Sequence, residues 1–369
     1  MSVAINGTNG ITYNDGSLQP SAPVGRNLII NGDMAIDQRN AGASATSNAT
    51  TYMTDRFQLQ MSSVTNVQTY QQVTDAPAGF NNSLKITNNS TTQATAAGVL
   101  STPRQKIEGL NTAYLNWGTS DAQTVTISFW VKASVTGTYP VSLINNDFTR
   151  SFVTNYTVSV ANTWEKKTAT IAGDTSGTWS VDNSTGISVM FSLDTGSTYQ
   201  TTAGSWQTGN YRGTSSDVHF LANASATWQI TGVQLEVGTE ATPFENLQYG
   251  TQLQLCQRYY EPTNGREVLL ARILQTNTRC RSQWHWKTPK RTAPTLSIDY
   301  VSAGLITCYY GDSGSRKVSH SETTLNTATI NGCFIDITIS ETMIANIGAT
   351  LHVRGDLSGE TRLIADAEL

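Results

Sequence analysis

The feature that most constrains the fold is a succession of short segments in which apolar and polar residues alternate. Residues 125–131 (VTISFWV) and 227–235 (TWQITGVQL) show this alternation clearly. A period of two places successive side chains on opposite faces of a β-strand. Clusters of glycine, aspartate and serine, such as residues 173–177 (GDTSG), end the segments after a few residues. Many short strands with such turns predict an all-β chain built as an antiparallel sandwich or barrel.

Further strand candidates follow the same pattern along the chain. They are residues 157–160, 167–171, 187–193, 295–298 and 334–339. Helical spacing is confined to 248–260 and 340–346, so a parallel sheet with alternating helices is not expected. Trp130, Trp164 and Trp228 lie in or beside strand patterns, and we expect all three to be core residues.

Charge is low for a chain of 369 residues, at 14% charged residues and a net charge of −4. No basic block is present, so nothing indicates nucleic-acid binding. No apolar run approaches the roughly 20 residues of a membrane span, and the first residues lack the pattern of a signal peptide. We therefore expect neither nucleic acid nor membrane insertion among its interactions.

Four segments are predicted: an N-terminal arm (1–26), a β-sandwich (27–247), a short linker or helical turn (248–260) and a distal β-sandwich domain (261–369). Charged residues are denser after residue 250, which supports a boundary there. The arm contains two Asn-Gly pairs, typical of tight hairpins, but too few apolar residues for a core. It either lies on a partner or forms a disordered tail.

The four cysteines all lie in the last third of the chain, at Cys256, Cys280, Cys308 and Cys333. Their wide spacing matches no metal-binding pattern. We expect buried free thiols, with a disulfide as the alternative.

Several motifs together resemble a known class of proteins. Residues 27–34 (NLIINGDM), 228–238 (WQITGVQLEVG) and 241–245 (ATPFE) are similar to the opening and closing of a jelly-roll module in bacteriophage tail and virion fibre proteins, which resembles carbohydrate-binding modules. Residues 10–19 (GITYNDGSLQ) resemble the segment before receptor-binding modules in phage fibres. The resemblance implies a subunit located in the virion, a homotrimer, and attachment to other virion proteins through residues 1–26.

The function that the resemblance implies is attachment by binding host-surface glycans. The alternative is a structural head fibre, decoration or adaptor subunit without a ligand. A head or tail position, the host and the receptor stay open. We expect no enzyme activity, because the four histidines form no catalytic motif, no nucleophile elbow is present, and no repeat suggests the β-helix of a depolymerase.

Candidate ligand-binding residues are aromatic and polar side chains in turn-rich stretches, because neutral sugars are held by ring stacking and placed hydrogen bonds. They are Tyr199, Trp206, Tyr211 and Arg212 in the jelly roll, and Tyr309, Tyr310 and Arg316 in the distal domain. The stretch around residues 199–212 is predicted to be a loop with exposed rings. In the alternative, Trp206 and Tyr211 pack over the end of the sandwich.

Two further sites stay open. Trp284 and Trp286 share one face of a predicted strand, either in a core or on a binding or trimer surface. Asp33 and Glu236 lie in the opening and closing motifs, where jelly-roll modules often hold a structural Ca²⁺. The alternative is a turn cap for Asp33 and a solvated side chain for Glu236.

Overall fold

The structure is a computed structural model in which two compact units are distinguished. It describes residues 4–6, 10–12, 18–19, 25–89, 92–263, 266–273, 279–299, 305–310, 314–318, 323–325, 328–338, 348–354 and 362–369. Within 4–19, 266–280, 305–324 and 337–354 the backbone alone is described. Unit 1 comprises Met1–Ala35 and Gly42–Gln248, and unit 2 comprises Ile36–Ala41 and Tyr249–Leu369.

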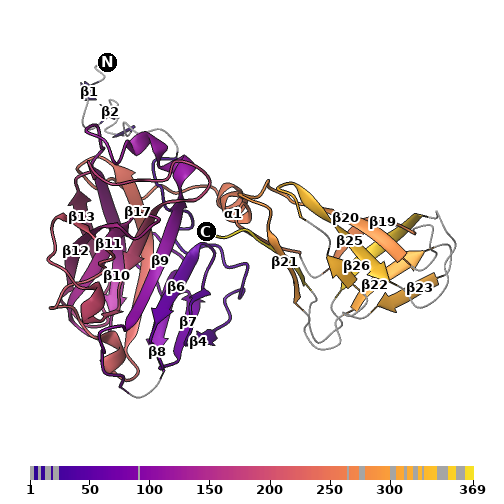
Figure 1. Cartoon of the computed structure of the whole chain (residues 1–369), viewed down its shortest axis with the longest axis horizontal. Coiled ribbons are helices and arrows are strands. Elements are labelled where there is room, and N and C mark those ends of the chain that lie inside the picture. The colour runs from indigo at the N-terminus through magenta and orange to yellow at the C-terminus, as the bar shows by residue number, and fades with distance from the viewer. Residues whose placement is uncertain are drawn as a thin grey trace. The chain divides into compact units, whose positions relative to one another are not determined.

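Unit 1 is built on two antiparallel sheets, as Figure 1 shows. The six-stranded sheet runs in the order β13 (Glu165–Ile171), β10 (Val125–Ala133), β17 (Thr227–Val237), β8 (Ser83–Asn88), β7 (Gln68–Val73) and β4 (Ala45–Ser47). The eight-stranded sheet runs in the order β16 (Trp206–Thr208), β12 (Arg150–Val158), β11 (Gly137–Ile144), β14 (Thr185–Phe191), β9 (Leu100–Glu108), β6 (Phe57–Ser62) and β5 (Thr51–Tyr52), with β15 (Asp194–Thr195) beside β9. Four short 3₁₀ helices are η1 (Gly109–Asn111), η2 (Ala113–Leu115), η3 (Ser197–Tyr199) and η4 (Phe220–Ala222). The predicted all-β, jelly-roll sandwich class is confirmed.

Alternation along β10 decides what enters the core. Ile127, Phe129 and Val131 are at most 1% exposed, because every second side chain of the strand points to the facing sheet. Trp228 on β17 is fully buried, as expected. Trp130 is only half-buried, since its position between Phe129 and Val131 turns it to the other face of the sheet. The prediction that Trp130 is a core residue was therefore wrong.

Trp164 is also half-buried rather than a core residue. It precedes β13, and its indole nitrogen donates to Asp75 Oδ1 over 3.4 Å. The ammonium of Lys132 lies 5.8 Å from the ring centroid, which places the ring beside charged surface groups.

A bulge in β17, near the end of unit 1, is hydrogen-bonded to the segment that opens the unit. The register between β10 and β17 shifts opposite Phe129, and Gly232 takes a φ of +61° there. The bulge turns Val233 out of the ladder, and its N–H donates to Gly32 O over 2.9 Å. The side-chain nitrogen of Asn27 donates to Val233 O over 3.1 Å, so the opening segment lies on the bulge.

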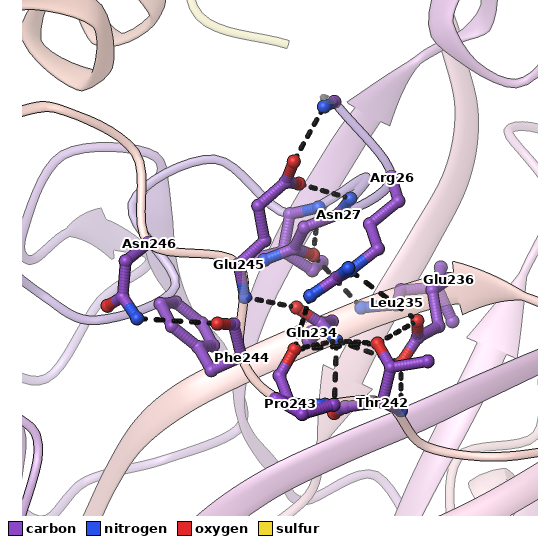
Figure 2. A network of polar contacts seen from close by, with 12 residues as sticks. Arg26, Asn27, Gln234, Leu235, Glu236, Thr242, Pro243, Phe244, Glu245 and Asn246 are labelled. Carbon is purple, nitrogen blue, oxygen red and sulfur yellow. Dashed lines mark hydrogen bonds and ion pairs between the residues drawn. The ribbon is translucent and has the colours of Figure 1, made fainter. Parts of the chain in front are cut away.

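The residues after β17 complete this connection (Figure 2). The carboxylate of Glu245 accepts hydrogen bonds from the N–H groups of Gly25 and Asn27, at 2.7 and 2.9 Å. Gln234 Oε1 in turn accepts from Glu245 N over 2.8 Å. The opening and closing motifs that stood out in the sequence are thus hydrogen-bonded to each other across more than two hundred residues.

Unit 2 begins with helix α1 (Tyr249–Gln257), which confirms the predicted helical turns after residue 248. Its three-stranded sheet has the order β18 (Tyr260–Pro262), β27 (Arg362–Asp366), β21 (Thr295–Asp299). Its seven-stranded sheet has the order β23 (Gly314–Val318), β22 (Leu305–Tyr310), β26 (Gly348–Arg354), β19 (Arg266–Ile273), β20 (Arg279–His285), β25 (Gly332–Thr338), β24 (Thr323–Leu325). The helix predicted at 340–346 falls wholly outside the described residues.

The core of unit 2 contains both tryptophans of the Trp-His-Trp sequence. Trp284 and Trp286 are 1% and 8% exposed and their rings meet edge-to-face at 4.6 Å. A buried ion pair lies beside them, with Lys290 Nζ 2.5 Å from Glu261. The core alternative therefore holds for these two rings. Cys256 and Cys333 are buried thiols outside any disulfide, as predicted, whereas the side chains of Cys280 and Cys308 lie outside the described part.

Residues 36–41 are part of unit 2 although they follow the opening motif of unit 1. The guanidinium of Arg39 lies 3.7 Å from the ring centroid of Tyr260 and 3.1 Å from Glu368. Gln38 donates to Tyr260 O over 3.1 Å. This segment is thereby attached to β18 and to the end of the chain after β27. No sequence pattern indicated that contact.

The N-terminal residues form β1 (Ala4–Asn6), β2 (Gly10–Thr12) and β3 (Leu18–Gln19), paired antiparallel in that order. The hairpin between β1 and β2 falls where the two Asn-Gly pairs predicted one.

The contact between Gly32 and the bulge leads to a stability prediction. A Cβ on residue 32 would lie 2.1 Å from Val233 O, closer than atoms can approach. Gly32→Ala should therefore reduce the free energy of unfolding by roughly 1–3 kcal/mol or more, as overpacking that forces the backbone to shift does. Gly98→Ala is the matched control, because its Cβ would meet only Ser63 Oγ at 3.4 Å. Equal denaturation midpoints for the two variants would contradict the close approach.

Candidate ligand-binding site

Two loops of unit 1 are fastened to each other and enclose a cavity. The first follows β9 and the second precedes β14. Gly109 N donates to Ser184 O over 2.8 Å, and Gly118 N donates to Asp174 O over 2.7 Å. Gly109 has to be glycine here, because a Cβ would lie 2.4 Å from the backbone oxygen of Ser180. The two loops therefore approach closely along their backbones.

An ion pair fixes the second loop to the eight-stranded sheet. Arg150 on β12 donates from Nε and Nη2 to the two carboxylate oxygens of Asp174, each over 2.7 Å. Asp174 is 1% exposed, and its carboxylate also raises the pKa of the Arg150 guanidinium. A two-pronged pair of this kind fixes orientation as well as distance.

The cavity between the loops has a volume of about 160 Å³. It is lined by Thr112, Ala113, Leu115, Asn116, Trp117, Thr119, Trp179, Ser180, Val181 and Ile187. The rings of Trp117 and Trp179 meet edge-to-face at 4.7 Å. Both indole nitrogens donate to backbone oxygens, of Gln123 and Ser176, so what the two rings bring to the cavity is apolar surface.

This lining combines apolar ring surface with hydroxyl and amide groups and carries no charged side chain. Such a set suits an uncharged ligand with one apolar face and several hydroxyls. At about 160 Å³ the cavity is smaller than the roughly 300–1,000 Å³ of drug-sized sites, so it matches a single ring. The cavity opens to the surface at Val181, which lines it and is 60% exposed.

Sequence reasoning missed Trp117 and Trp179. Both follow the rule that was applied to Trp206, since each lies among Asn, Gly, Thr and Ser residues rather than in a strand pattern. What the sequence could not show is the pairing of two loops that are about sixty residues apart.

Trp206 lies in strand β16, paired with β12, and not in a loop. Its half-buried ring meets the rings of Trp117, Phe152 and Trp179 edge-to-face, with centroids 5.3–5.4 Å away. Its indole nitrogen donates to Ala172 O over 2.8 Å. Trp206 therefore packs against the cavity's tryptophans rather than standing free at the surface.

Two of the other predicted residues meet each other. Arg212 is 2% exposed, and its guanidinium carbon lies 5.4 Å from the ring centroid of Tyr199 in η3. Tyr211 is half-buried, and its backbone N–H donates to Ser151 Oγ over 3.2 Å. The structure thus separates the set into Trp206, which belongs with the cavity, and the pair formed by Tyr199 and Arg212.

In unit 2, Tyr309 and Tyr310 lie in β22 and Arg316 lies in the neighbouring strand β23, with Arg316 opposite Cys308. Arg316 was predicted in a loop, and the pairing of β23 places it in a strand instead. The side chains of these three residues lie outside the described part.

Glu236 has donors at both carboxylate oxygens (Figure 2). Thr242 donates its N–H and its hydroxyl to Glu236 over 2.9 and 2.6 Å, and Arg26 Nε lies 3.8 Å away. Asp33 Oδ1 accepts from Ala35 N over 3.4 Å, as a turn cap would. In the described part of the chain, no group of three or more His, Cys, Asp or Glu side chains is placed to hold a metal ion.

A cluster of two carboxylates and a histidine lies at the ends of β15 and η4. His219 Nδ1 is 3.3 Å from Asp194 Oδ1, which also accepts from Thr95 Oγ1 over 2.6 Å. Asp217 accepts from the N–H and hydroxyl of Thr214 over 2.7 and 2.6 Å. Burial raises the pKa of both carboxyls. Their hydrogen bonds hold the chain between β15 and η4, which is a structural role.

Comparison of the sequence with protein-family models and with curated proteins found no match. Among solved structures, the enzymatically active domain of tailspike protein 4 of bacteriophage CBA120 is 12% identical over 58% of this chain and 22% of its own, with a TM-score of 0.31. A family 11 carbohydrate-binding module of Clostridium thermocellum is 13% identical over 60% of this chain and 100% of its own, with a TM-score of 0.28. The linked family 22 carbohydrate-binding and family 10 glycoside hydrolase modules of a C. thermocellum xylanase are 12% identical over 55% of this chain and 30% of their own, with a TM-score of 0.28. The chain thus spans about a fifth of the tailspike's length, and at these TM-scores the likeness carries nothing about ligands.

In the part of the chain that the structure describes, no helix is long and apolar enough to cross a membrane.

The packing of Trp206 leads to a second stability prediction. Trp206→Ala should lower the free energy of unfolding by roughly 2–4 kcal/mol, because a half-buried indole in contact with three rings is lost. Trp206→Phe should recover about half of that loss. Thermal melting of both variants measures the difference. An unchanged melting temperature in the alanine variant would mean that the ring is not part of the packing.

Proposed function

We propose that this chain is a non-catalytic attachment subunit of a bacteriophage particle, and that unit 1 binds host-surface glycans. The observation that carries the proposal is the cavity of about 160 Å³ lined by Trp117 and Trp179. Ring surface and small polar groups line the same space, and Val181 is exposed at its opening.

The physical reason is the chemistry of a neutral sugar. Such a ligand cannot form an ion pair with the protein, so its affinity comes from stacking on aromatic rings and from hydrogen bonds that are shielded from water. Asn116, Thr119 and Thr112 supply amide and hydroxyl groups beside the indoles. A pyranose ring has one apolar face and several hydroxyls, which complements this lining.

The attachment role is supported by the opening and closing motifs and by the low charge, and it includes a homotrimer and a docking function for residues 1–26. Light scattering of the purified chain that gave a monomer mass would remove the trimer from the proposal. The absence of catalysis is part of the proposal and is supported by the lack of a catalytic histidine motif, a nucleophile elbow or a fixed repeat in the sequence.

A substitution at the rim tests the glycan site. Val181 lines the cavity and is 60% exposed, so Val181→Glu should fold normally while placing a carboxylate at the apolar opening. We expect affinity for neutral glycans to fall by about tenfold or more, which corresponds to about 1.4 kcal/mol. Val160→Glu is the control, because Val160 is similarly exposed, at 56%, but does not line the cavity. Val160 follows β12 at the end of the strand that is distant from Arg150.

The measurement is a titration of the full chain with neutral glycans first selected on an array. Equal affinities of the two variants and the unchanged chain would contradict the assignment of the cavity. If the unchanged chain bound no glycan, the glycan function would be lost and the ligand-free structural role would remain.

A further inference from the structure

Two buried arginines occur close together in unit 1. Arg104 lies on β9 and Arg212 follows β16, and they are 5% and 2% exposed. Within the described residues neither forms an ion pair, in contrast to Arg150, which pairs with Asp174. A buried charge is normally compensated by an opposite charge, because removing it from water is costly.

A neutral oxygen stands between the two guanidinium groups. Gln60 Oε1 accepts from Nη1 of Arg104 over 2.6 Å and from Nη1 of Arg212 over 2.7 Å. The remaining contacts are also to amides, with Gln58 on Arg104 and Asn210 on Arg212. Two positive charges thus surround one amide oxygen, with no negative charge supplied by their hydrogen-bond partners.

The electrostatic consequence appears in the pKa values. Burial lowers the pKa of Arg104 to about 10. Burial lowers the pKa of Arg212 to about 10 as well, and the positive charge of Arg104 contributes to that shift. Both groups still carry their charge at neutral pH, so the pair is a local excess of positive charge in a poorly solvated place.

The pair is accessible at one point. Nη2 of Arg212 makes no hydrogen bond within the described part of the chain. This atom is not fully buried, so it is in contact with solvent. Two half-buried rings flank this guanidinium, with the centroids of Phe148 and Tyr199 at 5.3 and 5.4 Å from its carbon. A free donor between two rings combines charge recognition with ring surface.

We infer that Arg212 and Arg104 form a subsite for the oxyanion of an acidic sugar, a carboxylate or a sulfate, with Phe148 and Tyr199 beside the sugar ring. The oxyanion accepts a hydrogen bond from Nη2 of Arg212. Its negative charge compensates the two guanidinium charges, whose hydrogen-bond partners in the protein are neutral amides. This subsite is separate from the tryptophan-lined cavity. It rests on the proposed function only in taking a glycan as the carrier of the anion.

The experiment compares three soluble glycans on the full chain. Oligogalacturonate carries carboxylates, dextran sulfate carries sulfates, and dextran is the neutral reference. Arg104→Gln and Arg212→Gln are titrated beside Lys166→Gln, which removes the same charge at an exposed position of β13. Melting temperatures are recorded with and without each glycan, because a ligand that binds only the folded state raises the melting temperature.

We expect the unchanged chain and Lys166→Gln to bind at least one acidic glycan, more weakly as salt rises, and to melt at a higher temperature in its presence. Each arginine variant should lose about tenfold or more in that affinity, because Arg212→Gln removes the charge-assisted contact and Arg104→Gln removes the second positive charge beside it. The better of the two acidic glycans identifies the oxyanion.

Two results would overturn the inference: no binding of either acidic glycan by the unchanged chain, or equal binding by the arginine variants. A third pattern would show that the two arginines only stabilise the fold. In that case an arginine variant would melt several degrees lower without any glycan, and acidic glycans would not change the melting temperature of the unchanged chain. Failure of the glycan cavity looks different, because Val181→Glu affects neutral glycans and leaves this subsite intact.

Discussion

Unit 1 depends on the hydrogen bonds that join its opening segment to the bulge of β17. Gly232 breaks the ladder with β10, which frees the backbone of Val233 to meet Gly32 and Asn27. Glu245 then holds the backbone of Asn27 from the other side. Contacts between residues so far apart in the chain cost much conformational entropy, which the rest of the fold has to offset. Asn27 of the opening motif and Gln234 and Glu245 of the closing motifs serve this one connection.

A few specific contacts also fix the loops that enclose the cavity. Gly109 lets the two loops touch along their backbones, and the pair of Arg150 and Asp174 fixes the second loop to β12. Trp206 then fills the space behind Trp117 and Trp179. Packing and recognition are thus divided between neighbouring rings: Trp206 supports the rings that line the opening.

Much of the fold follows from local patterns, while the site does not. Alternation located β10 and β17, and helical spacing located α1, because these signals are carried by adjacent residues. The strand pattern wrongly predicted Trp164 as a core residue. Its place outside the core depends on the loop before β13 and not on the alternation. The attachment of residues 36–41 to unit 2 and the meeting of Arg104 with Arg212 arise from contacts between distant segments, which no window of sequence contains.

The most direct test of this account is a double-mutant cycle across the connection between the opening and closing motifs. Asn27→Ala removes the side chain that bonds Val233 and Leu235, and Glu245→Ala removes the carboxylate that holds Gly25 and Asn27. If both fasten one segment, the double variant should lose less free energy of unfolding than the two single losses together, by about 0.5–1 kcal/mol or more. Additive losses in urea denaturation would contradict the claim that the opening segment is held as a unit.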